Sequence, residues 1–72
     1  MTDEESAILL FLQRSPDEFI ARKEIARRAV KRKVFEENPH WVDAPLASLL
    51  NHRFVEQNDS AQYRLRKSEE LP

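Results

Sequence analysis

The chain of 72 residues contains no cysteine, no glycine and no long apolar run. Without cysteine, neither disulfides nor thiolate metal sites can hold the fold together, and His40 and His52 alone make no convincing metal site. The longest apolar run, Ala7 to Leu12, is far shorter than the roughly 20 residues that cross a bilayer. The start, Met1 to Glu5, is acidic, which is the reverse of the basic start of a signal peptide. We therefore expect a cytoplasmic protein with no membrane contact, no metal and no cofactor.

The absence of glycine also constrains the turns. A backbone position with positive φ has to be taken by another residue, and Asn and Asp tolerate that conformation best. We therefore expect positive φ at Asn38, Asn51, Asn58 or Asp59.

The residues of common enzyme sites are also missing. The chain has no cysteine nucleophile, no glycine-rich phosphate loop and no cluster of histidines with carboxylates. The acid pairs Asp17-Glu18 and Glu36-Glu37 remain, but nothing in so small a chain indicates a deep pocket around them. We expect that the protein is not an enzyme.

The net charge of −1 conceals a strong segregation of charge. One segment carries seven basic residues and a single acid, Glu24, so that it is +6 while the rest of the chain is −7: Arg22, Lys23, Arg27, Arg28, Lys31, Arg32 and Lys33. A local basic face can bind phosphate on a nearly neutral molecule, because salt limits the reach of each charge to about 8–10 Å. The alternative is a solvated helix face whose charges are balanced by Glu24, Glu36 and Glu37.

The first predicted helix runs from Thr2 or Asp3 to about Ser15. Thr2 with Glu5 fits a capping box, and Pro16 forces an extended residue before it. Its core face is Ile8, Phe11 and Leu12, whereas Leu9 and Leu10 extend the apolar surface around the helix. Leu10 is therefore expected to be exposed, and Leu9 and Leu10 to contact a second copy or another protein. The alternative is a helix packed deeply between its neighbours.

The second predicted helix runs from about Arg22 to Val34 or Phe35, after a short edge strand at Phe19–Ile20. Its buried stripe is Ile25, Ala26, Ala29 and Val30, and Lys33 falls on the core side. Phe35 and Trp41 flank the break at Pro39, where packing on the core is a better interpretation of Trp41 than stacking on a base. In the third helix Asp43 is the expected N-cap, Pro45 lies in the first turn, and the inward residues are Leu46, Leu49 and Leu50.

Alternating residues around a polar turn predict a β-hairpin at the end of the chain. Its strands contain Phe54-Val55 and Tyr63–Leu65, and its tip is Asn58-Asp59-Ser60. The predicted fold is mainly α with a small antiparallel β-hairpin, an α+β class, formed by three helices and a short strand between the first two. A single domain is expected over 1–66, followed by a flexible tail over 67–72.

Several segments together resemble the winged-helix superfamily. Ile8–Leu12 resembles its first helix, and Phe19–Ala26 its short strand leading into the second. Leu46-x-x-Leu49-Leu50 followed by Arg53–Glu56 is similar to the recognition helix entering the wing, and Tyr63–Leu65 to the closing strand. The resemblance covers residues 3 to 66. The chain departs from it in a longer connection, Glu36 to Val42, and in Asn51-His52-Arg53 at the position of the usual glycine before the wing.

The resemblance implies a DNA-binding protein, a transcriptional regulator or an accessory factor, whose third helix enters the major groove of double-stranded DNA. On that helix the residues implied in base contacts are Ser48, Asn51 and His52. The residues implied in phosphate contacts are Lys23, Arg27, Arg28, Lys31, Arg64 and Arg66. Two alternatives remain: these side chains form an ordinary solvated surface, or the scaffold serves as a protein-interaction module without DNA binding.

Overall fold

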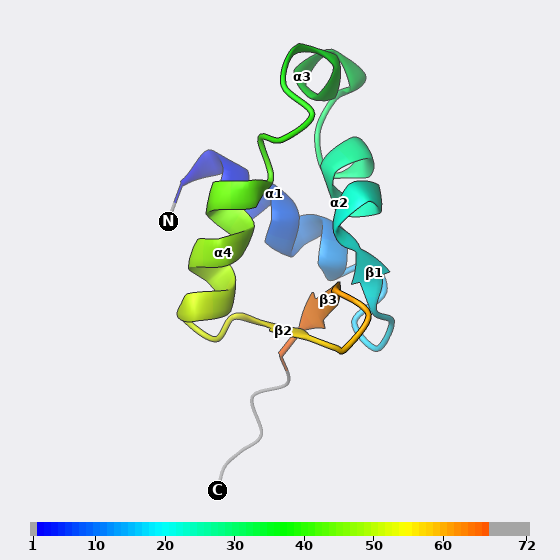
Figure 1. Cartoon of the computed structure of the whole chain (residues 1–72), viewed down its shortest axis with the longest axis vertical. Helices are drawn as coiled ribbons and strands as arrows, with labels where there is room; N and C mark the ends of the chain where they lie inside the picture. Colours follow the sequence, from blue (N-terminus) through cyan, green and yellow to red (C-terminus); the bar gives the residue numbers. More distant parts are fainter. Residues whose placement is uncertain (1, 67–72) are drawn as a thin grey trace, which may run out of the picture.

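The computed structural model describes residues 2–66 and contains four helices and three strands in that part of the chain (Figure 1). In chain order the elements are α1 (Asp3–Leu12), β1 (Ile20–Ala21), α2 (Arg22–Arg28), α3 (Arg32–Glu37), α4 (Asp43–Asn51), β2 (Val55–Gln57) and β3 (Gln62–Leu65). The predicted class, helices followed by an antiparallel hairpin, is confirmed. The predicted tail, 67–72, lies outside the described residues.

The start of α1 forms as the sequence predicts. The Thr2 side chain accepts from the Glu5 N–H at 3.1 Å, and the Glu5 carboxylate accepts from the Thr2 N–H at 2.7 Å. These two bonds complete a capping box. The helix ends at Leu12 rather than near Ser15, because the N–H groups of Arg14 and Ser15 turn to carbonyls three residues back.

The predicted helix over residues 22–34 is wrong, since the chain forms two helices there. The helical hydrogen bonds of α2 end with the one from the Ala29 N–H to the Ile25 carbonyl. The next carbonyl, that of Ala26, accepts instead from the Trp41 indole Nε1 at 2.9 Å. Lys31 then adopts an extended conformation (φ −64°, ψ 148°) that starts α3 in a new direction. Lys33 is consequently exposed and does not lie on the core side. Trp41 is 9% exposed and belongs to the core, which confirms the packing interpretation.

The start of α4 also differs from the prediction. Asp43 is not the N-cap: Val42 holds that position in a helical conformation, and its side chain makes no capping bond. Residues 39–42 already form turns, so the chain runs into the helix without the extended residue that a capping side chain needs. Pro45 does lie in the first turn. Backbone N–H groups there have no intrahelical acceptor, so the absence of an N–H on proline costs no hydrogen bond.

The three strands form one antiparallel sheet in the order β1-β3-β2, with Ile20 opposite Tyr63 and Val55 opposite Leu65. The predicted edge strand is therefore present, shifted by one residue. The hairpin loop is closed by Asn58, whose Oδ1 accepts from the N–H groups of Ser60 and Gln62 at 2.9 and 3.0 Å.

The turns place positive φ at two residues that the sequence did not indicate. Within residues 2–66, the non-glycine residues with positive φ are Arg53 at 65° and Ala61 at 59°, so the expectation of Asn or Asp is wrong. The reason is that both positions are set by the direction in which the chain leaves or enters an element: Arg53 follows the end of α4, and Ala61 directly precedes β3. Local side-chain preference is secondary to that geometry.

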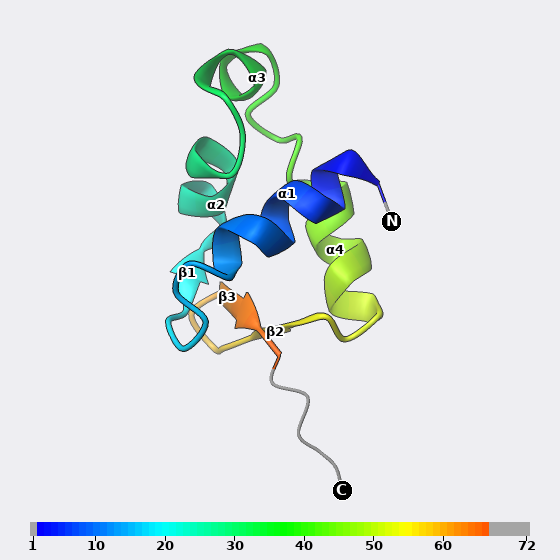
Figure 2. The same cartoon turned by 180° about the vertical axis from the view of Figure 1, so that it is seen from behind.

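One core is shared by α1, α2, α4 and the sheet. Its buried side chains are Ile8, Leu12, Ile25, Ala26, Trp41, Val42, Leu46, Leu49 and Val55. Figure 1 shows α4 and the hairpin in front, and the reverse view of Figure 2 shows α1 crossing the back, with α3 projecting at the far end in both. None of the helices described here is long and apolar enough to cross a membrane.

Candidate nucleic-acid interface

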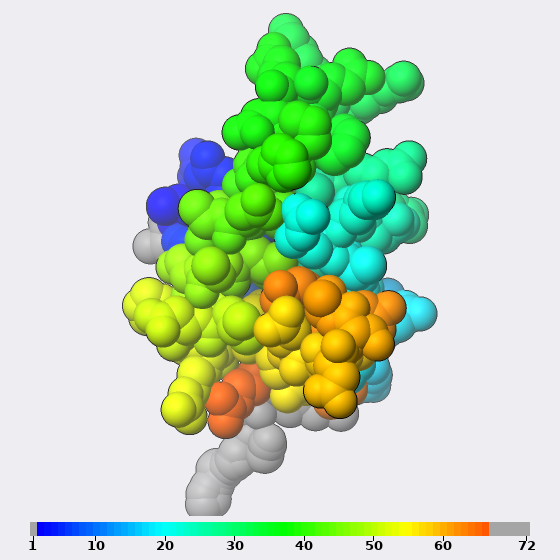
Figure 3. All heavy atoms as spheres, in the orientation of Figure 1, coloured from blue at the N-terminus to red at the C-terminus, as the bar shows by residue number. Residues whose placement is uncertain are grey.

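One face of the molecule combines α4, the start of α2 and the hairpin (Figure 3). An ion pair joins the two helices at their first turns, since Arg22 Nη1 lies 2.9 Å from Asp43 Oδ1. The ring Nδ1 of His40 lies 3.6 Å from the other oxygen of the same carboxylate. The acid at the start of α4, which by itself would repel a phosphate, is thus balanced by a guanidinium.

Beside this ion pair lies a basic groove between α2, α3 and the connection to α4. We call it the front groove; it is lined by Arg22, Lys23, Ala26, Arg27, Phe35, Pro39 and His40. Lys23 and Arg27 are exposed, and among residues 2–66 neither makes an ion pair. Two unpaired cations therefore stand next to the first turn of α4.

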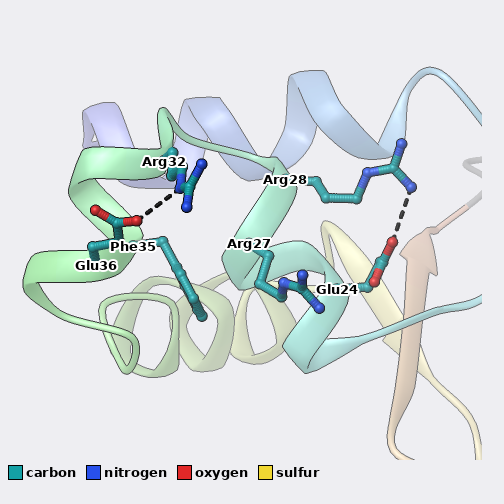
Figure 4. Close-up of a pocket in the computed structure, with 6 residues that line it drawn as sticks. All are labelled: Glu24, Arg27, Arg28, Arg32, Phe35 and Glu36. Carbon is teal, nitrogen blue, oxygen red and sulfur yellow. Dashed lines mark hydrogen bonds and ion pairs between the residues drawn. The ribbon is translucent and has the colours of Figure 1, made fainter.

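Arg27 also borders a second groove, of about 700 Å³, on the side of α2 that faces α3 (Figure 4). Here Arg28 pairs with Glu24 at 2.9 Å and Arg32 with Glu36 at 2.7 Å, both one helical turn apart. Of the three arginines in this groove, Arg27 is the one without such a partner. Exposed pairs of this kind contribute only about 0–1 kcal/mol, so a polyanion can displace the carboxylates.

Lys31 is separated from the other predicted phosphate ligands. The extended backbone between α2 and α3 turns it toward α1, where it lines a different groove with Asp3, Glu4 and Ala7. A continuous helix would have kept Lys31 in line with Arg27 and Arg28, one turn further on. Arg27 therefore lies between Lys23 in the front groove and Arg28 in the second groove, whereas Lys31 lies apart from all three.

Arg64 is occupied by contacts within the protein. It forms an ion pair with Glu56 on β2, its Nη1 donates to the Asp17 carbonyl at 3.3 Å, and its guanidinium lies 4.3 Å from the ring centroid of Phe19. The side chain is only 28% exposed. Its predicted phosphate contact would compete with all three interactions, whereas Arg66, directly after β3, is exposed.

The three predicted base-reading residues do not share one environment. Asn51 is exposed on the outer side of α4, together with Ala44 and Ala47. Ser48 is half-buried, and the proximity of its hydroxyl to the Glu5 carboxylate is the largest cause that lowers the pKa of Glu5. Ser48 is therefore directed toward α1 and not toward an outside ligand.

His52 is exposed at the end of α4, and its Nδ1 lies 2.8 Å from the Ser48 carbonyl oxygen. Because a carbonyl only accepts, this contact places a proton on Nδ1 and leaves Nε2 as the acceptor of the neutral ring. When the ring is protonated, Nε2 becomes a donor toward an outside group. The neutral His52 ring can thus accept a hydrogen bond from a base edge, and the protonated ring can donate one to a phosphate.

Sequence reasoning missed the ion pair between Arg22 and Asp43, because no local pattern relates residues that are 21 positions apart in the chain. No group of three or more His, Asp or Glu residues in the described part is arranged to hold a metal ion. The chain matches no protein-family model, no curated protein and no solved structure. The geometry of its own residues is therefore the basis for assigning a function.

Proposed function

We propose that the protein is a small cytoplasmic winged-helix DNA-binding domain, a transcriptional regulator or an accessory DNA-binding protein. Phosphates are contacted by Lys23, Arg27 and Arg28, and base edges by Asn51 and His52 on α4. The observation that supports this most directly is the pair of exposed, unpaired cations, Lys23 and Arg27, beside the first turn of α4.

The arrangement of elements favours the same proposal. A helix, an edge strand, further helices and a closing hairpin follow one another, and the central strand of the sheet is β3. This is the order that the resemblance to winged-helix proteins implies. It leaves α4 on the molecular surface next to the hairpin, where a helix can enter the major groove of DNA (Figure 3).

The outer face of α4 sets the expected kind of recognition. Ala44 and Ala47 are small, so the helix backbone can approach the base edges closely, and alanine can contact a thymine methyl group. Asn51 can form two hydrogen bonds with adenine. No exposed Arg or Lys lies on α4, so affinity depends mainly on phosphate contacts and sequence preference is modest.

The test is binding of labelled mixed-sequence duplex DNA, followed by fluorescence anisotropy at about 50 and 200 mM salt. We expect binding that weakens steeply at the higher salt, because phosphate contacts release counterions. Lys23→Ala combined with Arg27→Ala should weaken binding to every sequence alike and reduce the salt slope by about 1.8, or 0.9 for each lost contact. Arg14→Ala removes one exposed charge outside the front groove and is the matched control.

Two results would contradict the proposal. One is a folded protein that binds no duplex at either salt concentration. The other is a loss with Arg14→Ala as large as with the double variant, since the charge of the front groove would then have no special role. Asn51→Ala tests the base contact separately: it should change the preference among sequences, and an equal loss on all of them would exclude readout by Asn51.

The second candidate is a protein-interaction module on the same scaffold, without DNA binding. It is favoured by the lack of exposed cations on α4 and by an uncovered apolar groove between α1 and α3. The DNA titration separates the two candidates, since only the first predicts a steep dependence on salt.

A further inference from the structure

The face opposite the proposed DNA-binding surface carries an apolar groove, here called the α1–α3 groove. One wall belongs to α1, and the other to the end of α2 and to α3; the lining residues are Asp3, Glu4, Ala7, Ala29, Val30, Lys31 and Val34. In Figure 2 α1 lies on the side nearest the viewer, with no other helix or strand in front of it. The groove residues of α1 come from its N-terminal half, Asp3 to Ala7.

The helix α3 is loosely packed: of its six residues Phe35 packs against the core, and it is only partly buried. The helix has no buried side chain and no side-chain cap. In water such a short helix is not stable by itself, because too few hydrogen bonds offset the cost of nucleation. Val34 is 42% exposed and points its apolar surface at the groove instead of at the core.

The α1 wall extends the apolar surface. Ala7 and Leu10 share one side of the helix with Asp3, at spacings of four and three residues. Leu10 is 64% exposed, which confirms the expectation from the sequence, whereas Leu9 packs against the core. An exposed leucine that continues an open apolar groove is typical of a surface covered by a protein partner.

The charges at the edges of the groove indicate what that partner is. Asp3 and Glu4 lie on the α1 wall, and Lys31 lies on the opposite wall. Among residues 2–66 none of the three makes an ion pair. A two-fold axis running along the groove would bring the α1 wall of each copy onto the Lys31 wall of the other, so that the surface is complementary to itself.

We propose that the α1–α3 groove is the interface of a homodimer, with Val34 of each copy against Ala7 and Leu10 of the second copy and Glu4 facing Lys31 across the edge. The interface leaves α4 and the start of α2 open in both copies, since these lie on the face seen in Figure 3 and α1 lies on the reverse face (Figure 2). Dimerisation through this surface does not depend on whether the protein binds DNA.

The test is the molar mass of the protein without DNA, by sedimentation equilibrium over micromolar to millimolar concentrations. We expect the mass to rise from the 8.5 kDa of one chain toward twice that value. Val34→Asp should remain a monomer throughout, with an unchanged circular dichroism spectrum because the side chain is outside the core. Phe54→Asp is the matched control, since Phe54 is 48% exposed but lies outside the groove, and it should still dimerise.

Charge reversal tests the two-fold arrangement independently of the apolar contact. Lys31→Glu and Glu4→Lys should each weaken dimerisation about three- to tenfold, and the two together should restore it, because opposite charges again face each other. A double variant as weak as the single ones would overturn the arrangement. A wild-type monomer at every concentration, or a Val34→Asp dimer, would overturn the proposal, whereas the DNA titration tests the proposed function by itself.

Discussion

Replacing Arg53 by glycine should make the protein more stable, although Arg53 is exposed. Arg53 follows the C-cap of α4, and its φ is 65°. The N–H groups of Phe54 and Arg53 donate to the carbonyls of Leu49 and Leu50 at 2.9 and 3.1 Å. This pair of bonds is a Schellman motif, which requires a left-handed residue at the position of Arg53.

The size of the effect follows from two opposing terms. A residue with a Cβ in the left-handed region costs about 1–2 kcal/mol. Glycine avoids that cost but loses about 0.5–1 kcal/mol more conformational entropy on folding. The difference predicts that Arg53→Gly raises the free energy of unfolding by about 0.5–1 kcal/mol, or the Tm by about 2–8 °C for a domain of this size.

The assay is urea unfolding followed by circular dichroism, with Arg53→Ala as the control. Alanine removes the same charge but keeps the Cβ, so its stability should stay within about 0.5 kcal/mol of the wild type. Asn51→Gly, inside the last turn of α4, should destabilise by about 0.5–1 kcal/mol. If Arg53→Gly is no more stable than Arg53→Ala, the backbone conformation at this position does not limit stability and the reasoning is wrong.

Two further predictions concern contacts between helices. Trp41→Phe removes the indole N–H that satisfies the buried Ala26 carbonyl and should cost about 1–3 kcal/mol in urea unfolding; a loss below about 0.5 kcal/mol would show that water replaces the indole. The pKa of Glu5 is lowered, first by the Ser48 hydroxyl and then by the Thr2 N–H. Its contribution to stability is therefore complete above the unfolded pKa and is lost as the pH falls through the folded pKa. Ser48→Ala should raise the pKa of Glu5 in an NMR titration, and an unchanged value would place the Ser48 hydroxyl elsewhere.

Features set within a few residues of the chain were predictable from the sequence. Thr2 and Glu5 form the expected capping box, and Pro45 lies in the first turn of α4. The hairpin follows from alternating residues around Asn58, whose side chain closes the loop. Such features need only interactions within one turn of helix or one loop, which the sequence shows directly.

The candidate site was only partly predictable, because it depends on where α2 ends. The basic run 22–33 was evident as charge, but the structure divides it: Lys23 and Arg27 border the front groove, and Lys31 faces α1. The break between these residues coincides with the bond from Trp41, fifteen residues beyond Ala26. Helical periodicity assumes a continuous helix, so it could not assign these side chains to different faces.

The sequence by itself determined the class of fold, the capped first helix, the exposed Leu10 and the hairpin, since each depends on local spacing and on the pattern of apolar residues. Only the tertiary structure decided that Asp43 pairs with Arg22, that Ser48 turns to Glu5, and that the basic run splits between two faces. The physical reason is that these contacts join residues on different helices. Their partners are selected when the apolar core brings those helices together, and no local pattern along the chain records that packing.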